Sequence, residues 1–148
     1  MAAVLGAVVG SVATGGAALV TSMGTARLQS RKERRESSLA LMSEVRTAVH
    51  LSEDVMIHAT AAREEGRTPD YAQFHARSLE SRRRVEKCCD VVVLAGPQKV
   101  KSACDELAEA ARSLHAAIRR GDEARIKAAV GKLFRGLDAL QEMGSSSG

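Results

Sequence analysis

The hydrophobic positions divide the chain into an apolar N-terminal segment and a longer region with helical spacing. Residues 1–26 carry no charged side chain. At about 1.5 Å per residue, some 20 of them in a helix cross the roughly 30 Å hydrocarbon layer of a bilayer. From residue 27 onward, apolar residues recur at every third or fourth position, as in a helix that buries one face. The pattern predicts an all-α protein, in which an N-terminal transmembrane helix continues into an antiparallel up-down helical bundle.

Glycine and proline mark the limits of the first two bundle helices. The first helix runs on from the apolar segment and is expected to end at Gly66. Thr68 is the predicted N-cap of the second helix and Pro69 its first residue, because proline has no amide hydrogen to leave unpaired there. The apolar string 91–95 also fits a short strand, but helix is favoured because no second strand exists to pair with it.

The last two helices are also delimited by turn residues. Gly96 and Pro97 end the second helix, and the third begins near Gln98. Gly121 is expected to stop the third helix and Asp122 to cap the fourth. Short links make consecutive helices antiparallel. The organisation we expect is an anchor (1–26), a basic juxtamembrane helix (27–38), a helical bundle (39–143) and a disordered tail (144–148).

Charge changes the interpretation of the N-terminal segment. Residues 27–36 hold five basic and two acidic side chains, a net charge of +3, which leaves only +1 of the total +4 for the rest of the chain. A secretory signal peptide carries its basic residues before the apolar core, whereas here they follow it. An uncleaved anchor is therefore favoured over a cleaved signal or a buried helix. The positive-inside rule places the N-terminus outside and the bundle in the cytoplasm, at the inner (cell) membrane. The residues expected to bind anionic lipid are Arg27, Arg31, Lys32, Arg34 and Arg35.

Gly6 and Gly10 form a GxxxG pair within the predicted anchor. Small residues at this spacing allow two transmembrane helices to approach closely, so the pair is a candidate for homodimerisation. The alternative is that the pattern arises from a segment rich in Gly, Ala, Ser and Thr.

One polar set has the residue types of a metal site. His50, Asp54 and His58 follow one another at i, i+4 and i+8, along one side of a helix. Two imidazoles and a carboxylate could bind zinc or another transition metal, with further ligands from a neighbouring helix. No HExxH or ExxH pattern accompanies them, so a solvated polar face is the favoured interpretation, and no cofactor is expected.

The cysteines and the densest basic run are weaker candidates for a functional site. Cys88, Cys89 and Cys104 show no CxxC spacing. Cys89 and Cys104 lie equally far from the Gly96–Pro97 turn and should meet at one level, as reduced thiols in a reducing compartment or as a disulfide if the domain is exported.

The run 82–84 consists of three arginines pointing about 100° apart, partly neutralised by nearby acids and without aromatic residues to stack a base. It predicts an ion-paired surface, so no nucleic-acid partner is expected.

The stretch RLQSRKERRE and the later VVVLAGPQKVKSACDELAEAARSLHAAI carry a resemblance. The chain is similar to a loose group of small actinobacterial membrane-anchored proteins that share a Gly/Ala-rich span, an Arg-rich helix and a V-x-L-x-G-P-x-x-V-x-x-A turn. The residues that match this turn are Val92, Leu94, Gly96, Pro97, Val100 and Ala103. The resemblance implies the architecture and assigns no functional residue.

The sequence contains no phosphate-binding loop, nucleophile elbow or carboxylate pair suited to acid-base chemistry, so an enzyme is not expected. The favoured function is a single-pass membrane protein whose helical bundle binds a protein partner or itself. One alternative is a metal-binding or metal-sensing bundle that uses His50, Asp54 and His58. Another is a small membrane-perturbing protein of phage or toxin type.

Overall fold

The chain is helical over almost its whole described length. The computed structural model describes the backbone of residues 2–146 and the side chains of residues 23–146, except that of residue 95. No strand occurs among these residues, so the all-α prediction is confirmed and the possible strand at 91–95 is excluded. The elements are α1 (Ala2–Glu64), the 3-10 helix η1 (Ala72–Phe74), α2 (His75–Ala95), α3 (Gln98–Arg120) and α4 (Glu123–Ser146).

The chain divides into two compact units, Met1–Arg35 and Glu36–Gly148. Within the residues that the structure describes, no helix has an apolar stretch long enough to cross a bilayer. The predicted anchor includes residues 1–22, whose side chains lie outside that description, and so does the predicted self-association pair Gly6 and Gly10. The transmembrane helix therefore stays a prediction.

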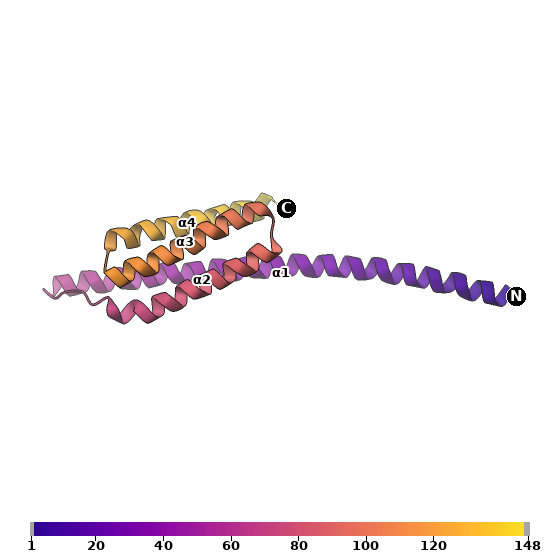
Figure 1. Cartoon of the computed structure of the whole chain (residues 1–148), viewed down its shortest axis with the longest axis horizontal. Helices are drawn as coiled ribbons and strands as arrows, with labels where there is room; N and C mark the ends of the chain where they lie inside the picture. Colours follow the sequence, from indigo (N-terminus) through magenta and orange to yellow (C-terminus); the bar gives the residue numbers. More distant parts are fainter. Residues whose placement is uncertain (1, 147–148) are drawn as a thin grey trace. The chain divides into compact units, whose positions relative to one another are not determined.

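The second unit is a helical bundle in which consecutive helices run in opposite directions (Figure 1). One hydrophobic core joins the end of α1 to α2, α3 and α4. Because α3 packs closely against α2 on one side and α4 on the other, it supplies more buried residues than α2 or α4. The largest fully buried side chains are Leu41, Leu107, Ile118, Ile126 and Leu133.

Two of the predicted helix ends are made by glycine in the left-handed conformation. Gly66 has a φ of 71° and Gly121 a φ of 65°. After Gly66, the Arg67 amide donates to the Ala62 carbonyl at 2.7 Å, five residues back. Gly121 is followed by the same bond at 3.0 Å, from the Asp122 amide to the Ala117 carbonyl. Both ends are Schellman motifs, which satisfy carbonyls that the helix itself leaves free.

The predicted start of the second helix is wrong. Thr68 and Pro69 precede it and are not helical; η1 begins at Ala72 and α2 at His75. Asp70 Oδ1 accepts the Ala72 amide hydrogen at 3.0 Å, whereas Tyr71 and Phe74, the N-cap residues of η1 and α2, make no side-chain capping bond. Neither helix therefore begins with the predicted threonine cap.

A contact between distant segments holds the connection between α1 and η1 in a non-helical conformation. The Tyr71 hydroxyl donates to Glu123 Oε1 at 2.8 Å, and Arg63 donates to the same carboxylate oxygen. The Tyr71 ring lies so close to Gly121 that a Cβ there would come within 2.7 Å of the ring. The hydrogen bond from Arg63 is the main reason that the pKa of Glu123 lies below its usual range. This cluster joins the end of α1, the start of η1 and the start of α4.

The two remaining boundaries lie in the second half of the chain. Helix α3 begins at Gln98, directly after the Gly96–Pro97 turn, as predicted. Asp122 caps α4 as expected, since its Oδ1 accepts the Arg125 amide hydrogen at 3.2 Å. Helix α4 then continues through Ser146. Residues 144–146 therefore belong to the helix rather than to the predicted disordered tail, and residues 147–148 lie outside the description.

Helix α4 packs tightly against α3 at Gly136. A Cβ on this residue would lie 2.5 Å from Cδ2 and 2.6 Å from Cγ of Leu107, which is itself fully buried. By contrast, a Cβ on Gly131 of the same helix would find its nearest atom, in the Arg135 side chain, at 3.9 Å. The two glycines differ in their surroundings, although both lie within α4.

We therefore expect opposite effects from the same substitution at these positions. Gly136→Ala should lower the free energy of unfolding by about 1–3 kcal/mol, because Leu107 must move within a packed core. Gly131→Ala should raise it by about 0.5–1 kcal/mol, the usual gain in helix propensity. Thermal and urea unfolding followed by circular dichroism measures both. Equal effects of the two substitutions would contradict the close α3–α4 contact.

Candidate functional site

The three metal-site candidates lie on α1, and two of them have partners of their own. His50 Nδ1 lies 3.1 Å from Glu53 Oε2, one turn further along the helix. Asp54 Oδ2 accepts a hydrogen bond from the Arg77 guanidinium of α2 at 3.1 Å. Each polar group is thus paired with a neighbour that does not belong to the predicted set.

The third candidate, His58, faces the start of α2. Its Nε2 lies 3.0 Å from the Gln73 amide nitrogen, and its ring meets the Phe74 ring edge-on with centroids 5.5 Å apart. Among the described residues, no three His, Cys, Asp or Glu side chains come close enough together to hold a metal ion. The structure therefore does not assemble the set needed for the metal hypothesis.

The basic juxtamembrane residues belong to the first unit. All five are exposed: Arg27, Arg31, Lys32, Arg34 and Arg35. No described helix has an apolar stretch long enough to cross a bilayer, so their expected contact with lipid stays a prediction.

Cys89 and Cys104 meet in the interface between α2 and α3, as their equal distance from the turn predicted. Both are free and buried. The hydrogen bond between the two thiols, together with burial, raises the pKa of Cys89. The same hydrogen bond lowers the pKa of Cys104, but both thiols are almost fully buried, so the pair acts as core packing.

The arginine run 82–84 is paired with acids of its own helix. Arg84 Nε donates to Glu80 Oε1 at 2.9 Å, and Arg82 lies 3.7 Å from Glu86. These are i, i+4 pairs on a helix surface, each of modest strength. The expected ion-paired surface is therefore confirmed for Arg82 and Arg84.

A buried polar contact between α2 and α3 was not predicted from the sequence. It joins Ser78 to His115, although the spacing of His115 from Ala111 and Ile118 already places it on the buried face of α3. Ser78 Oγ donates to the His75 carbonyl at 3.0 Å and lies 2.7 Å from His115 Nδ1. Since a hydroxyl has one hydrogen, His115 donates from Nδ1 to Ser78.

The surroundings of His115 oppose its protonation. Burial is the main cause of its lowered pKa, followed by the positive charges of Arg82 and Arg119 and by His75. No carboxylate partner for His115 occurs within the described part of the chain, and Ser78 is almost fully buried. The pair therefore lacks both the third group and the access that a nucleophilic serine needs.

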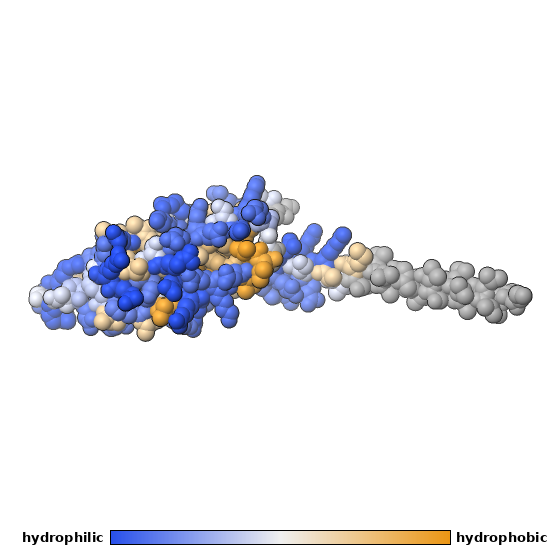
Figure 2. All heavy atoms as spheres, in the orientation of Figure 1, coloured by the Kyte–Doolittle hydropathy of each residue, from blue (hydrophilic) through white to orange (hydrophobic). Residues whose placement is uncertain are grey.

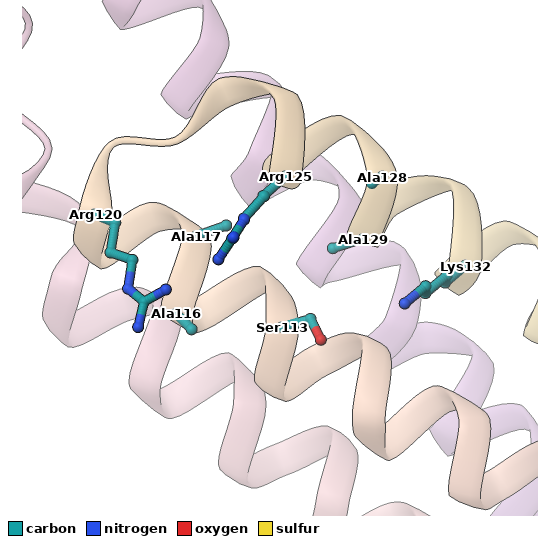
Figure 3. Close-up of a pocket in the computed structure, with 8 residues that line it drawn as sticks. All are labelled: Ser113, Ala116, Ala117, Arg120, Arg125, Ala128, Ala129 and Lys132. Atoms are coloured by element: carbon teal, nitrogen blue, oxygen red, sulfur yellow. The ribbon is translucent and has the colours of Figure 1, made fainter.

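A groove of about 310 Å³ lies between the outer faces of α3 and α4 (Figure 3). Alanine side chains form its floor, and long basic side chains stand at its rim. Arg120 and Arg125 lie on either side of the α3–α4 turn, and Lys132 lies two helical turns further along α4. The lining residues are Ser113, Ala116, Ala117, Arg120, Arg125, Ala128, Ala129 and Lys132.

The rim of the groove is positive. Asp122 is the acidic residue beside it, and its Oδ2 already pairs with Arg125 Nε at 3.3 Å. Within the described part of the chain, neither Arg120 nor Lys132 forms an ion pair. The groove was not predicted from the sequence, because its cations come from two helices and are not clustered in the chain. The paired alanines 116–117 and 128–129 were the available indication.

No protein-family model, curated protein or solved structure matches this chain. The resemblance to actinobacterial membrane-anchored proteins therefore stays an expectation, and function must be argued from the residues themselves.

The Ser78–His115 contact leads to a pH-dependent stability. Because the pKa of His115 is lowered in the folded protein, the unfolded chain binds its proton first as the pH falls below about 6.5. Stability is then lost progressively until the pH reaches the folded pKa. In His115→Asn the amide can still donate to Ser78 but does not titrate, so this loss should be absent.

Urea unfolding of both proteins between pH 8 and pH 5 measures this difference. The two proteins differ only at residue 115, so the comparison isolates this side chain. An unchanged difference between the two unfolding free energies over this range would contradict the assignment.

Proposed function

We propose that this protein is a non-catalytic, single-pass membrane protein whose bundle lies at the cytoplasmic face of the cell membrane and binds a protein partner. Residues 1–26 supply a charge-free segment of sufficient length for the span. The basic residues that follow favour a cytoplasmic bundle, and each Lys or Arg near an anionic surface contributes about 1 kcal/mol of attraction.

The observation that carries this proposal is an exposed apolar end of the bundle. Leu94 is 89% exposed, Leu39 53% and Val91 47%. Figure 2 shows apolar side chains gathered on the surface of the bundle near the α2–α3 turn. Exposed apolar clusters of this kind are typical of surfaces that meet a membrane or another protein.

The topology puts this apolar end where the chain enters the bundle. The bundle part of α1 and α2 run antiparallel, and Cys88 of α2 lies close enough to Glu44 of α1 to be influenced by its charge. With that register, Leu94 lies at the level of the first bundle residues, near Leu39. In the proposed topology, this is the end of the bundle at which the chain arrives from the span. Lys99 and Lys101, both exposed just after the turn, add positive charge suited to anionic lipid.

Membrane insertion and orientation can be tested on the full chain with a tag after Gly148. We expect the protein in the membrane fraction after alkaline carbonate extraction. We also expect the tag to resist protease in intact spheroplasts and to be digested after lysis, because the bundle is cytoplasmic. Extraction by carbonate, or digestion in intact spheroplasts, would contradict the proposal.

The position of the apolar end can be tested with tryptophan as a probe, because the chain contains none. In vesicles of anionic lipid with brominated acyl chains, Leu94→Trp should emit at short wavelength and be quenched. Ile57→Trp is the matched control, since Ile57 is 68% exposed and lies about 27 Å further along α1 than Leu39. It should emit as in water. Water-like emission from both variants would show that the apolar end does not face lipid.

A further inference from the structure

We propose that the groove between α3 and α4 binds an acidic amphipathic helix of a partner protein. This inference rests on the proposed role of the bundle as an interaction module and names the chemistry of its partner.

The shape of the groove suits a helix. Two antiparallel helices with alanines at their facing outer positions leave a shallow channel, and side chains that end at Cβ allow a third helix backbone to approach closely. The lining covers about two turns of each helix, from Ser113 to Arg120 and from Arg125 to Lys132. The contact is therefore short, which indicates a weak or transient interaction.

The charge of the groove selects an acidic occupant. Arg120, Arg125 and Lys132 stand around an apolar floor, and Asp122, the carboxylate beside them, is already paired with Arg125. Arg125 and Lys132 are seven residues apart, two turns on one face of α4. A partner helix with carboxylates at i and i+7 and small apolar residues between them matches both the rim and the floor.

The surroundings favour a protein over the other polyanions. No aromatic side chain lines the groove to stack a nucleic-acid base. The groove borders the α3–α4 turn, at the opposite end of the bundle from the apolar α2–α3 turn, so a lipid surface at that apolar end does not reach it (Figure 1).

The test uses the full chain in detergent and a fluorescent synthetic helical peptide with an alanine stripe and glutamates at i and i+7. Polyglutamate and single-stranded RNA serve as polyanions without that stripe. We expect fluorescence anisotropy to report saturable peptide binding. The double variant R120E/K132E should weaken it by about tenfold or more, because each attraction becomes a repulsion. The control K101E/K127E reverses as many charges on α3 and α4 outside the groove and should bind the peptide like the unaltered chain.

A second variant tests the shape of the groove without changing its charge. Ala128 is exposed in the groove, so Ala128→Phe should fill the channel and abolish peptide binding without changing any charge. Polyglutamate or RNA binding as tightly as the peptide, or unchanged peptide binding by Ala128→Phe, would overturn the proposal. So would a dimer of this chain that R120E/K132E dissociates, because the occupant would then be a second copy. None of these results depends on membrane insertion, which the carbonate and protease experiment decides separately.

Discussion

The contact between Gly136 and Leu107 sets the spacing on which the rest of the bundle depends. At this point α4 approaches α3 so closely that residue 136 has room only for hydrogen. The chain needs such closeness because it has one Tyr, two Phe and no Trp, and it fills its core largely with Ala, Val and Leu. Small side chains exclude water and gain dispersion energy only when the helices that carry them lie close together. Close helix packing is thus what allows a core with few aromatic residues to be filled.

Close packing also determines which polar groups enter the core. The inner face of α2 carries Ser78, Ser81 and Cys89, whose small volumes fit between closely spaced helices. A buried hydroxyl or thiol then needs a partner, because leaving it unpaired costs about 1–3 kcal/mol. Ser78 contacts His115 and Cys89 contacts Cys104, both across the α2–α3 interface, whereas Ser81 Oγ has no hydrogen-bond partner among the described residues. These pairs cost the protein some pH tolerance at His115, but they fix the register of two helices whose apolar faces alone are small.

The helix ends that could be predicted are those decided by neighbouring residues. Gly66, Gly121 and Asp122 act within a turn of their own position, so their local chemistry sufficed. The start of α2 was misplaced because Tyr71 is held by Glu123, a residue 52 positions away. The groove escaped prediction for the same reason, since its rim cations become neighbours only when α3 and α4 pair. Helical spacing alone, by contrast, would have placed His115 inside.

One end of the bundle is apolar and the other borders a basic groove, so the two proposed binding surfaces lie far apart. Leu39, Val91 and Leu94 expose apolar surface at the α2–α3 turn. The other end is held together by the carboxylate of Glu123 with Arg63 and Tyr71, and it borders the basic groove. A bundle fixed to lipid by its apolar end keeps the groove away from the anionic lipid headgroups that would otherwise compete for its cations. The surface proposed to meet the membrane and the groove proposed to bind the partner lie at opposite ends of the bundle, so an acidic helix would reach the groove without competition from lipid.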